Sequence, residues 1–88
     1  MREIRIDGRT LHTLSELRSA VVRAVGAHGT VGHTVEAITE LLEIEPLSLT
    51  WDHSADSERA MGAAVFGRVV AAWRDLEARR ATFRLALR

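Results

Sequence analysis

The sequence predicts a small α/β domain in which a three-stranded parallel sheet is combined with three or four helices. Two observations carry this prediction. Apolar and polar residues alternate in three short segments, as they do in half-buried strands: residues 2–7, 47–51 and 82–87. The stretches between these segments have apolar residues at helical spacing. In a chain of 88 residues, strands separated by helices are expected to pair in parallel through right-handed crossovers.

The first helix has a recognisable signal at each end. Thr13 and Glu16 have the spacing of a capping box, in which the hydroxyl accepts from the amide three residues on and the carboxylate reaches back. Leu17 and Val21 lie four residues apart on what becomes the apolar face. Gly26 then supplies a helix terminator. We therefore expect a helix over residues 14–25.

The second half of the chain is expected to hold two more helices. One begins after Thr34, the expected N-cap, and runs to about Glu43, and the other covers residues 61–78. The polar stretch 52–60 is interpreted as a loop with a short helical turn. Gly62 would lie inside the long helix and weaken it by about 1 kcal/mol.

The charges are unevenly distributed along the chain. All twelve basic residues are Arg, and none falls within residues 34–58, although the formal net charge of the whole chain is zero. This stretch holds seven acids: Glu36, Glu40, Glu43, Glu45, Asp52, Asp56 and Glu58. The first three share one side of the expected second helix, where like charges repel by a few tenths of a kcal/mol per adjacent pair. Such a block indicates a solvated face or a docking surface for a basic partner.

Composition restricts the classes of function that the chain can have. The absence of Cys leaves no disulfide framework and no thiolate chemistry. No window approaches the run of ~18 apolar residues that a membrane span needs, and the N-terminus lacks the pattern of a signal peptide. We expect a single domain over residues 1–88, located in the cytoplasm and without membrane contact.

Three kinds of chemical site were considered against the residue pattern. His33, Glu36 and Glu40 could bind a metal from one helix face, but no further ligand has a suitable spacing. The same two glutamates, taken as an acid and a base, would lack the burial that separates pKa values. The Arg-rich C-terminal quarter lacks stacking aromatics, because Phe66 and Trp73 fall on apolar stripes. We therefore expect no enzymatic activity, no cofactor, no metal and no direct binding of nucleic acid.

Six segments spread over essentially the whole chain resemble the barstar family of small intracellular ribonuclease inhibitors. No single motif carries the resemblance, which depends on the order and spacing of the segments and on the matching chain length. The segments are Ile4–Gly8, Leu14–Leu17, residues 32–40 with a Gly-x-x-x-acid-Ala-x-x-acid pattern, residues 46–51 with a Pro-Leu-x-Leu-x-Trp pattern, residues 70–75 and residues 81–85.

The resemblance implies a protein that binds one basic, secreted ribonuclease and blocks its active site with the second helix and the preceding loop. Glu36 and Glu40 match the two helix carboxylates of the family, and Asp75 matches an acid on the last helix. Thr30, Val31 and Thr39 stand at positions that are aromatic in barstar itself. The partner-binding residues carried over are Thr30, Val31, Gly32, His33, Glu36, Thr39, Glu40 and Asp75. The alternative is an immunity or regulatory protein of the same fold, directed at a non-ribonuclease toxin or another partner.

Overall fold

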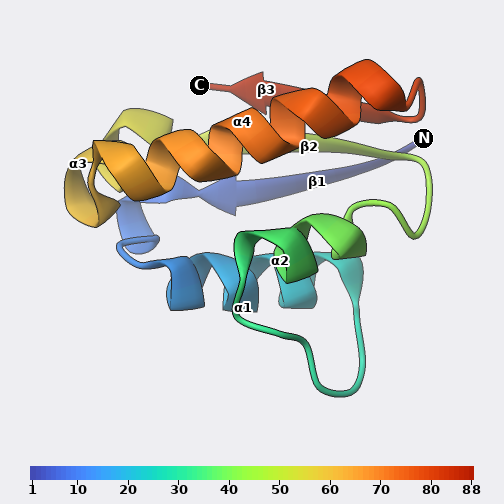
Figure 1. Ribbon diagram of the computed structural model, residues 1–88, viewed down its shortest axis with the longest axis horizontal. Coiled ribbons are helices and arrows are strands. Elements are labelled where there is room, and N and C mark those ends of the chain that lie inside the picture. Colours follow the sequence, from blue (N-terminus) through green and yellow to red (C-terminus); the bar gives the residue numbers. More distant parts are fainter.

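A parallel sheet forms one layer of the molecule, and most of the helices lie on one side of it (Figure 1). The computed structural model describes residues 1–88. The strands are β1 (Arg2–Asp7), β2 (Leu47–Asp52) and β3 (Phe83–Leu87). They pair in the order β1-β2-β3, and both pairings are parallel. The expected three-stranded parallel sheet is therefore confirmed.

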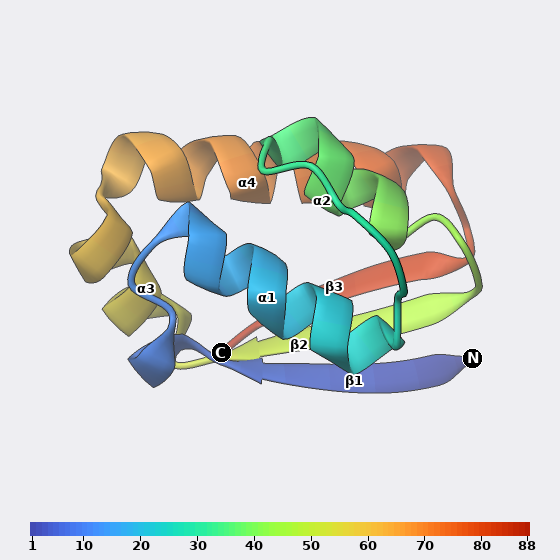
Figure 2. The same ribbon diagram turned by 90° about the horizontal axis from the view of Figure 1, so that it is seen from below.

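Four α-helices and one short 3-10 helix connect the strands. In chain order they are η1 (Gly8–Thr10), α1 (Leu14–Val25), α2 (Val35–Leu41), α3 (Ser54–Met61) and α4 (Ala63–Arg79). Seen from below, α1, α2 and α4 lie on the same side of the sheet (Figure 2). The helix predicted over residues 14–25 is confirmed, and its Thr13 hydroxyl accepts from the Glu16 amide at 3.1 Å. The Glu16 carboxylate reaches back to the His12 amide at 3.0 Å.

The interpretation of residues 52–60 as mostly loop is wrong, because most of this stretch belongs to α3. Its Ser57 is completely buried. The Ser57 hydroxyl donates to the Gly8 carbonyl at 2.9 Å and accepts from the Trp51 indole N–H at 3.2 Å. These bonds join α3 to η1 and β2, so tertiary contacts stabilise a helix that has little apolar periodicity of its own.

The long C-terminal helix begins two residues later than predicted. Gly62 has φ of 92° and ψ of 149°, which is incompatible with a helix interior, and it separates α3 from α4. Met61 therefore ends α3, and α4 starts at Ala63. Glycine tolerates this left-handed half of the backbone map, whereas an L side chain would be strained there. The break lets two helices with different axes follow each other without a loop.

The core lies between the inner face of the sheet and the helices. Trp51 of β2 is at its centre, with ring centroids 5.1 Å from Phe66 and 5.5 Å from Trp73. These side chains and Phe83 are buried, which confirms that the aromatic residues belong to the core. On the opposite face of the sheet most residues are polar, and they include an Arg5–Asp52 ion pair at 2.9 Å. None of the helices combines the length and the apolar composition needed to span a bilayer.

Candidate functional site

Helix α2 presents two neighbouring carboxylates to solvent. Val35 and Ile38 are buried in the core, so the opposite face of this helix is directed toward solvent. Glu36 and Glu40 are both exposed there, and residues four apart in a helix are neighbours. The Thr34 hydroxyl caps the helix by accepting from the Ala37 amide at 3.1 Å. Glu36 lies in the first turn, where the helix dipole favours a negative charge.

A shallow depression of about 320 Å³ separates these carboxylates from α4. Helix α2 lies beside α4 in both ribbon views (Figures 1 and 2). The packing brings Asp75 of α4 to the same depression as Glu36 and Glu40, which were predicted to act together. The residues that line it are Glu36, Thr39, Glu40, Glu43, Ala72, Asp75 and Arg79.

A second depression, of about 340 Å³, adjoins the first on the other side of α2. Glu40 lines both depressions, which together make up the candidate surface on the two sides of α2. The second is lined by Thr30, Val31, Gly32, Ala37, Glu40, Leu41 and Ile44. Seven of the eight residues predicted for the site therefore line this surface. The eighth residue, His33, is exposed on the loop before α2 and lines neither depression.

The loop before α2 contacts both α1 and α2. The Arg18 Nε of α1 donates to the Val31 carbonyl at 2.9 Å. At Gly32 an added Cβ would come within 3.0 Å of the Ala37 Cβ, so the loop passes close to α2 and a larger residue would displace it. These contacts place Thr30 and Val31 beside the helix carboxylates.

Thr39 contributes to the floor of the first depression and offers little surface to a partner. Its exposed fraction is 8%. Its hydroxyl donates to the Val35 carbonyl at 2.7 Å, one turn earlier in α2. The side chain therefore has its hydrogen bond within the helix. The sequence pattern did not separate Thr39 from the exposed positions of the site.

Folding divides the acidic block of residues 34–58 into paired and unpaired carboxylates. Glu45 bonds Arg2 at 2.7 Å, Asp52 bonds Arg5 at 2.9 Å, Asp56 bonds Arg59, and Glu43 lies 3.9 Å from both Arg79 and Arg80. Glu36, Glu40 and Glu58 form no ion pair and no side-chain hydrogen bond with the rest of the chain. The block is thus not a continuous acidic surface. At the candidate site its charge is concentrated on the two glutamates of α2.

Arg79 places a positive charge within the first depression. Its Nε donates to the Asp75 carboxylate at 2.8 Å, one helical turn away. Asp75 therefore has a cationic partner within its own chain, although its side chain is 66% exposed. Sequence reasoning missed Arg79, but the i, i+4 spacing of the two residues could have revealed the pair.

Ile44 is the second residue that the sequence did not assign to the site. Its exposed fraction is 72%, which makes it one of two large apolar side chains on the surface. It follows α2 and lines the second depression with Val31 and Leu41. An apolar side chain in such a position loses water on binding a partner, which contributes to affinity.

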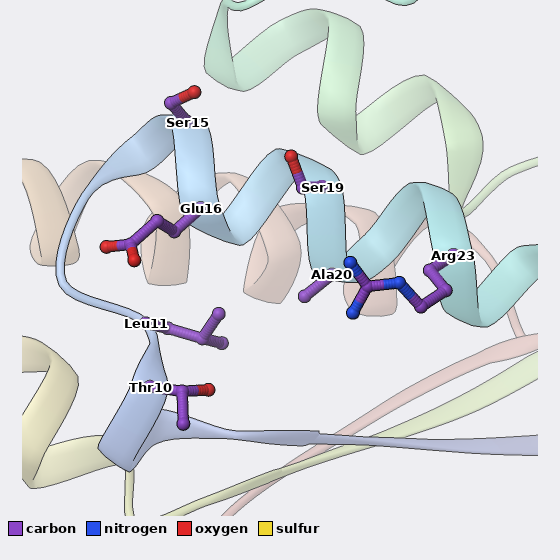
Figure 3. Close-up of a pocket in the computed structure, with 7 residues that line it drawn as sticks. All are labelled: Thr10, Leu11, Ser15, Glu16, Ser19, Ala20 and Arg23. Carbon is purple, nitrogen blue, oxygen red and sulfur yellow. The ribbon is translucent and has the colours of Figure 1, made fainter.

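Two further depressions lie on the outer side of α1 and contain none of the predicted residues. Figure 3 shows one of them, about 250 Å³, with Arg23 extended beside Ala20 and with Glu16 and Leu11 opposite. The other is about 300 Å³ and reaches β1. No group of three His, Asp or Glu side chains is placed to hold a metal ion.

Comparison with known proteins finds no family match. No protein-family model matches the chain, and no curated protein does so either.

Proposed function

We propose that the protein is an inhibitor of the barstar type, which acts inside the producing cell and binds one basic, secreted ribonuclease. Helix α2 and the loop before it block the active site of the enzyme. The observation that supports this function is the exposed pair Glu36 and Glu40, which forms no ion pair within its own chain, next to Asp75 of α4.

Two carboxylates on one helix face can replace the phosphates of a nucleic-acid substrate. A ribonuclease active site is lined with cationic side chains that bind phosphate. Burying a carboxylate without a partner is costly, and Glu36 and Glu40 would recover this cost only from cations supplied by the target. Attraction between the acidic helix and the basic enzyme also accelerates the encounter, and salt weakens that effect.

The carboxylates are held in position before any partner arrives. Val35 and Ile38 are buried beneath them, the Thr34 cap fixes the first turn, and Arg18 holds the loop. Little conformational freedom of the backbone is then lost when the complex forms, and this favours tight binding.

Asp75 has a secondary role in this proposal. Its carboxylate bonds Arg79, so a cation of the target must compete with this arginine or share the carboxylate with it. Arg79 therefore moderates the negative potential of the depression, and Glu36 and Glu40 provide the dominant attraction.

The test is inhibition of RNA hydrolysis by a panel of purified basic microbial ribonucleases. The wild-type chain is expected to inhibit at least one of them, and Glu36→Gln/Glu40→Gln is expected to lose this inhibition. Glu58→Gln is the matched control, because it removes an exposed, unpaired glutamate on α3, which lies outside both depressions. Equal inhibition by the double variant and the wild type would contradict the proposed site.

A second function is favoured by the side chains around the carboxylates. Large aromatic side chains are typical hot spots of interfaces, but this rim has Thr30, Val31 and Ile44. A small aliphatic rim fits a different target surface, so the protein is alternatively an immunity or regulatory protein for a non-ribonuclease toxin or another partner. Capture of the bound protein and its identification by mass spectrometry separates the two: a ribonuclease supports the first function, and a different toxin supports the second.

A further inference from the structure

The two edges of the sheet differ in how their backbone groups are satisfied. At the outer edge of β3, the Leu85 amide donates to the Glu77 carboxylate at 2.8 Å. Arg74 donates to the Leu85 carbonyl at 2.9 Å and also bonds Glu77 at 3.0 Å. These α4 side chains occupy the groups that another strand would need for pairing, which is a known way of protecting a sheet edge.

The outer edge of β1 has no comparable protection. The Arg2 amide donates to the Pro46 carbonyl on the β2 side. Because successive residues of a strand direct their backbone groups to alternate sides, those of Glu3, Arg5 and Asp7 point away from β2. Among them only the Asp7 carbonyl is bonded, by the Thr10 hydroxyl at 3.1 Å. Figure 2 shows β1 along the margin of the molecule, with no element beyond it.

We propose that a second copy of this chain pairs with β1 in antiparallel orientation, so that the two sheets form one continuous sheet around a two-fold axis. Such isologous contacts are the commonest way in which identical chains associate. Pairing would satisfy the amide and carbonyl groups of Glu3 and Arg5, which otherwise remain unpaired at the edge.

The charges of β1 select one register of this pairing. With Ile4 opposite Ile4 of the second copy, each Glu3 lies opposite an Arg5. Both residues direct their backbone groups outward, so each such pair also exchanges two hydrogen bonds. Opposite charges directly across a strand pair are favourable, and like charges are unfavourable. Glu3 is exposed and forms no ion pair in its own chain. This register places it opposite Arg5, which also bonds Asp52 of its own chain at 2.9 Å and would share its charge between the two carboxylates.

Other registers are less compatible with the structure. Centring the pair on Arg5 places two arginines opposite each other and Glu3 opposite Asp7. Centring it on Ile6 places Arg5 opposite Asp7, whose carboxylate is already held by Arg9 at 2.9 Å. In that register Glu3 would face residue 9, but Arg9 lies in η1 beyond the end of β1 and already bonds Asp7.

The flank of α1 next to this edge leaves space for the second copy. Ala20 and Ala24 line the depression of about 300 Å³ that reaches Ile6 of β1. Arg23 of α1 lines the same depression and is exposed, so its long side chain must turn aside when a second copy approaches. The β1 edge contributes no residue to the two depressions around α2, so each chain of the dimer would keep its own candidate site.

Sedimentation equilibrium over a range of protein concentrations tests the dimer. The wild type is expected to dimerise reversibly, and Glu3→Arg and Arg5→Glu are each expected to raise the dimer Kd about tenfold or more. An equimolar mixture of these two single variants restores opposite charges at both pairs and is expected to form a heterodimer. The double variant Glu3→Arg/Arg5→Glu is expected to form a homodimer again.

The control is Arg84→Glu, on the exposed face of β3 beside the protected edge, which should leave the dimer Kd unchanged. Thermal unfolding of each variant shows whether it is folded. Glu3→Arg changes a side chain without contacts, whereas Arg5→Glu also removes the ion pair with Asp52, so the Kd of Glu3→Arg is the more direct measure of the interface. A wild type that stays monomeric at millimolar concentration would overturn the proposal. Single variants that dimerise as well as the wild type, or a mixture that remains monomeric, would also do so.

Discussion

The carboxylates of α2 and those around the sheet differ in what they bind. Glu77 accepts hydrogen bonds from the Leu85 amide and from Arg74. Asp7 accepts from the backbone and side chain of Arg9. Glu36 and Glu40 bind no group of their own chain. The difference suggests two uses of negative charge: Glu77 and Asp7 bond groups of the folded chain, and we propose that the neighbouring pair on α2 bonds a partner.

The pKa values of the matched carboxylates reflect their contacts. The hydrogen bond from the Leu85 backbone lowers the pKa of Glu77, and the Arg74 bond lowers it further. The pKa of Asp7 falls to about 2, mainly because the Arg9 side chain donates to it. These groups consequently stabilise the folded chain in their ionised form.

The largest effect is expected when a carboxylate of α2 is removed. Glu40→Gln should weaken binding to a target ribonuclease by about 2–5 kcal/mol, because a cation of the target remains buried without its partner. The free energy of unfolding should change by less than about 0.5 kcal/mol, since Glu40 is exposed and unpaired. Calorimetric titration and urea unfolding measure the two quantities. A loss of stability as large as the loss of affinity would place Glu40 among the carboxylates that hold the fold.

Ser57→Ala should lower the stability of the chain and leave its affinity for a target unchanged, which is the reverse of the effect expected for Glu40→Gln. It leaves the Gly8 carbonyl and the Trp51 indole N–H without their buried partner, which costs about 1–3 kcal/mol of stability. Affinity for a target should not change, because Ser57 lies outside both depressions of the site. Urea unfolding gives the stability. An unchanged midpoint would show that these two hydrogen bonds contribute nothing to the fold.

The pH dependence of stability in Glu77→Gln tests whether a carboxylate bonded within the chain stabilises the fold in its ionised form. The pKa of Glu77 is lowered in the folded chain, so its contribution is fully present above the ordinary value of 4.5 and is lost as the pH falls toward the folded pKa. The variant should lose about 1 kcal/mol of stability at pH 7, because the side chain is partly exposed. This deficit should shrink as the pH is lowered below 4.5. A deficit that is constant with pH would exclude a role for the ionised carboxylate.

The smallest expected effect concerns the arginine inside the candidate site. Arg79→Gln removes an exposed ion pair and frees Asp75, which strengthens attraction for a basic target by about 0.2–1 kcal/mol. The gain should appear mainly in the association rate constant measured by stopped-flow mixing. Weaker binding by this variant would indicate that Arg79 contacts the target directly.

Periodicity predicted most of the fold. Alternation located the three strands, and the capping residues Thr13 and Thr34 placed the starts of two helices correctly. The sequence predicted only a short helical turn where α3 forms, because the bonds of Ser57 that stabilise this helix join residues far apart in the chain. It also placed Gly62 inside a helix, since apolar spacing alone does not show a change of backbone conformation.

The candidate site could be predicted only in part. The i, i+4 spacing placed Glu36 and Glu40 on one helix face, as the structure has them. The position of Asp75 beside them came from the resemblance to a family, because the packing of α4 on α2 has no local signal. The burial of Thr39 and the exposure of Ile44 depend on that packing as well.

The central claim is that Glu36 and Glu40 form a preassembled anionic surface for a cationic partner. The most direct test is the rate constant for association with a ribonuclease that the protein inhibits, measured over a range of ionic strengths. The wild-type rate constant should fall steeply with salt, and Glu36→Gln/Glu40→Gln should flatten this dependence while Glu58→Gln leaves it unchanged. Equal salt dependence for the wild type and the double variant would contradict the claim.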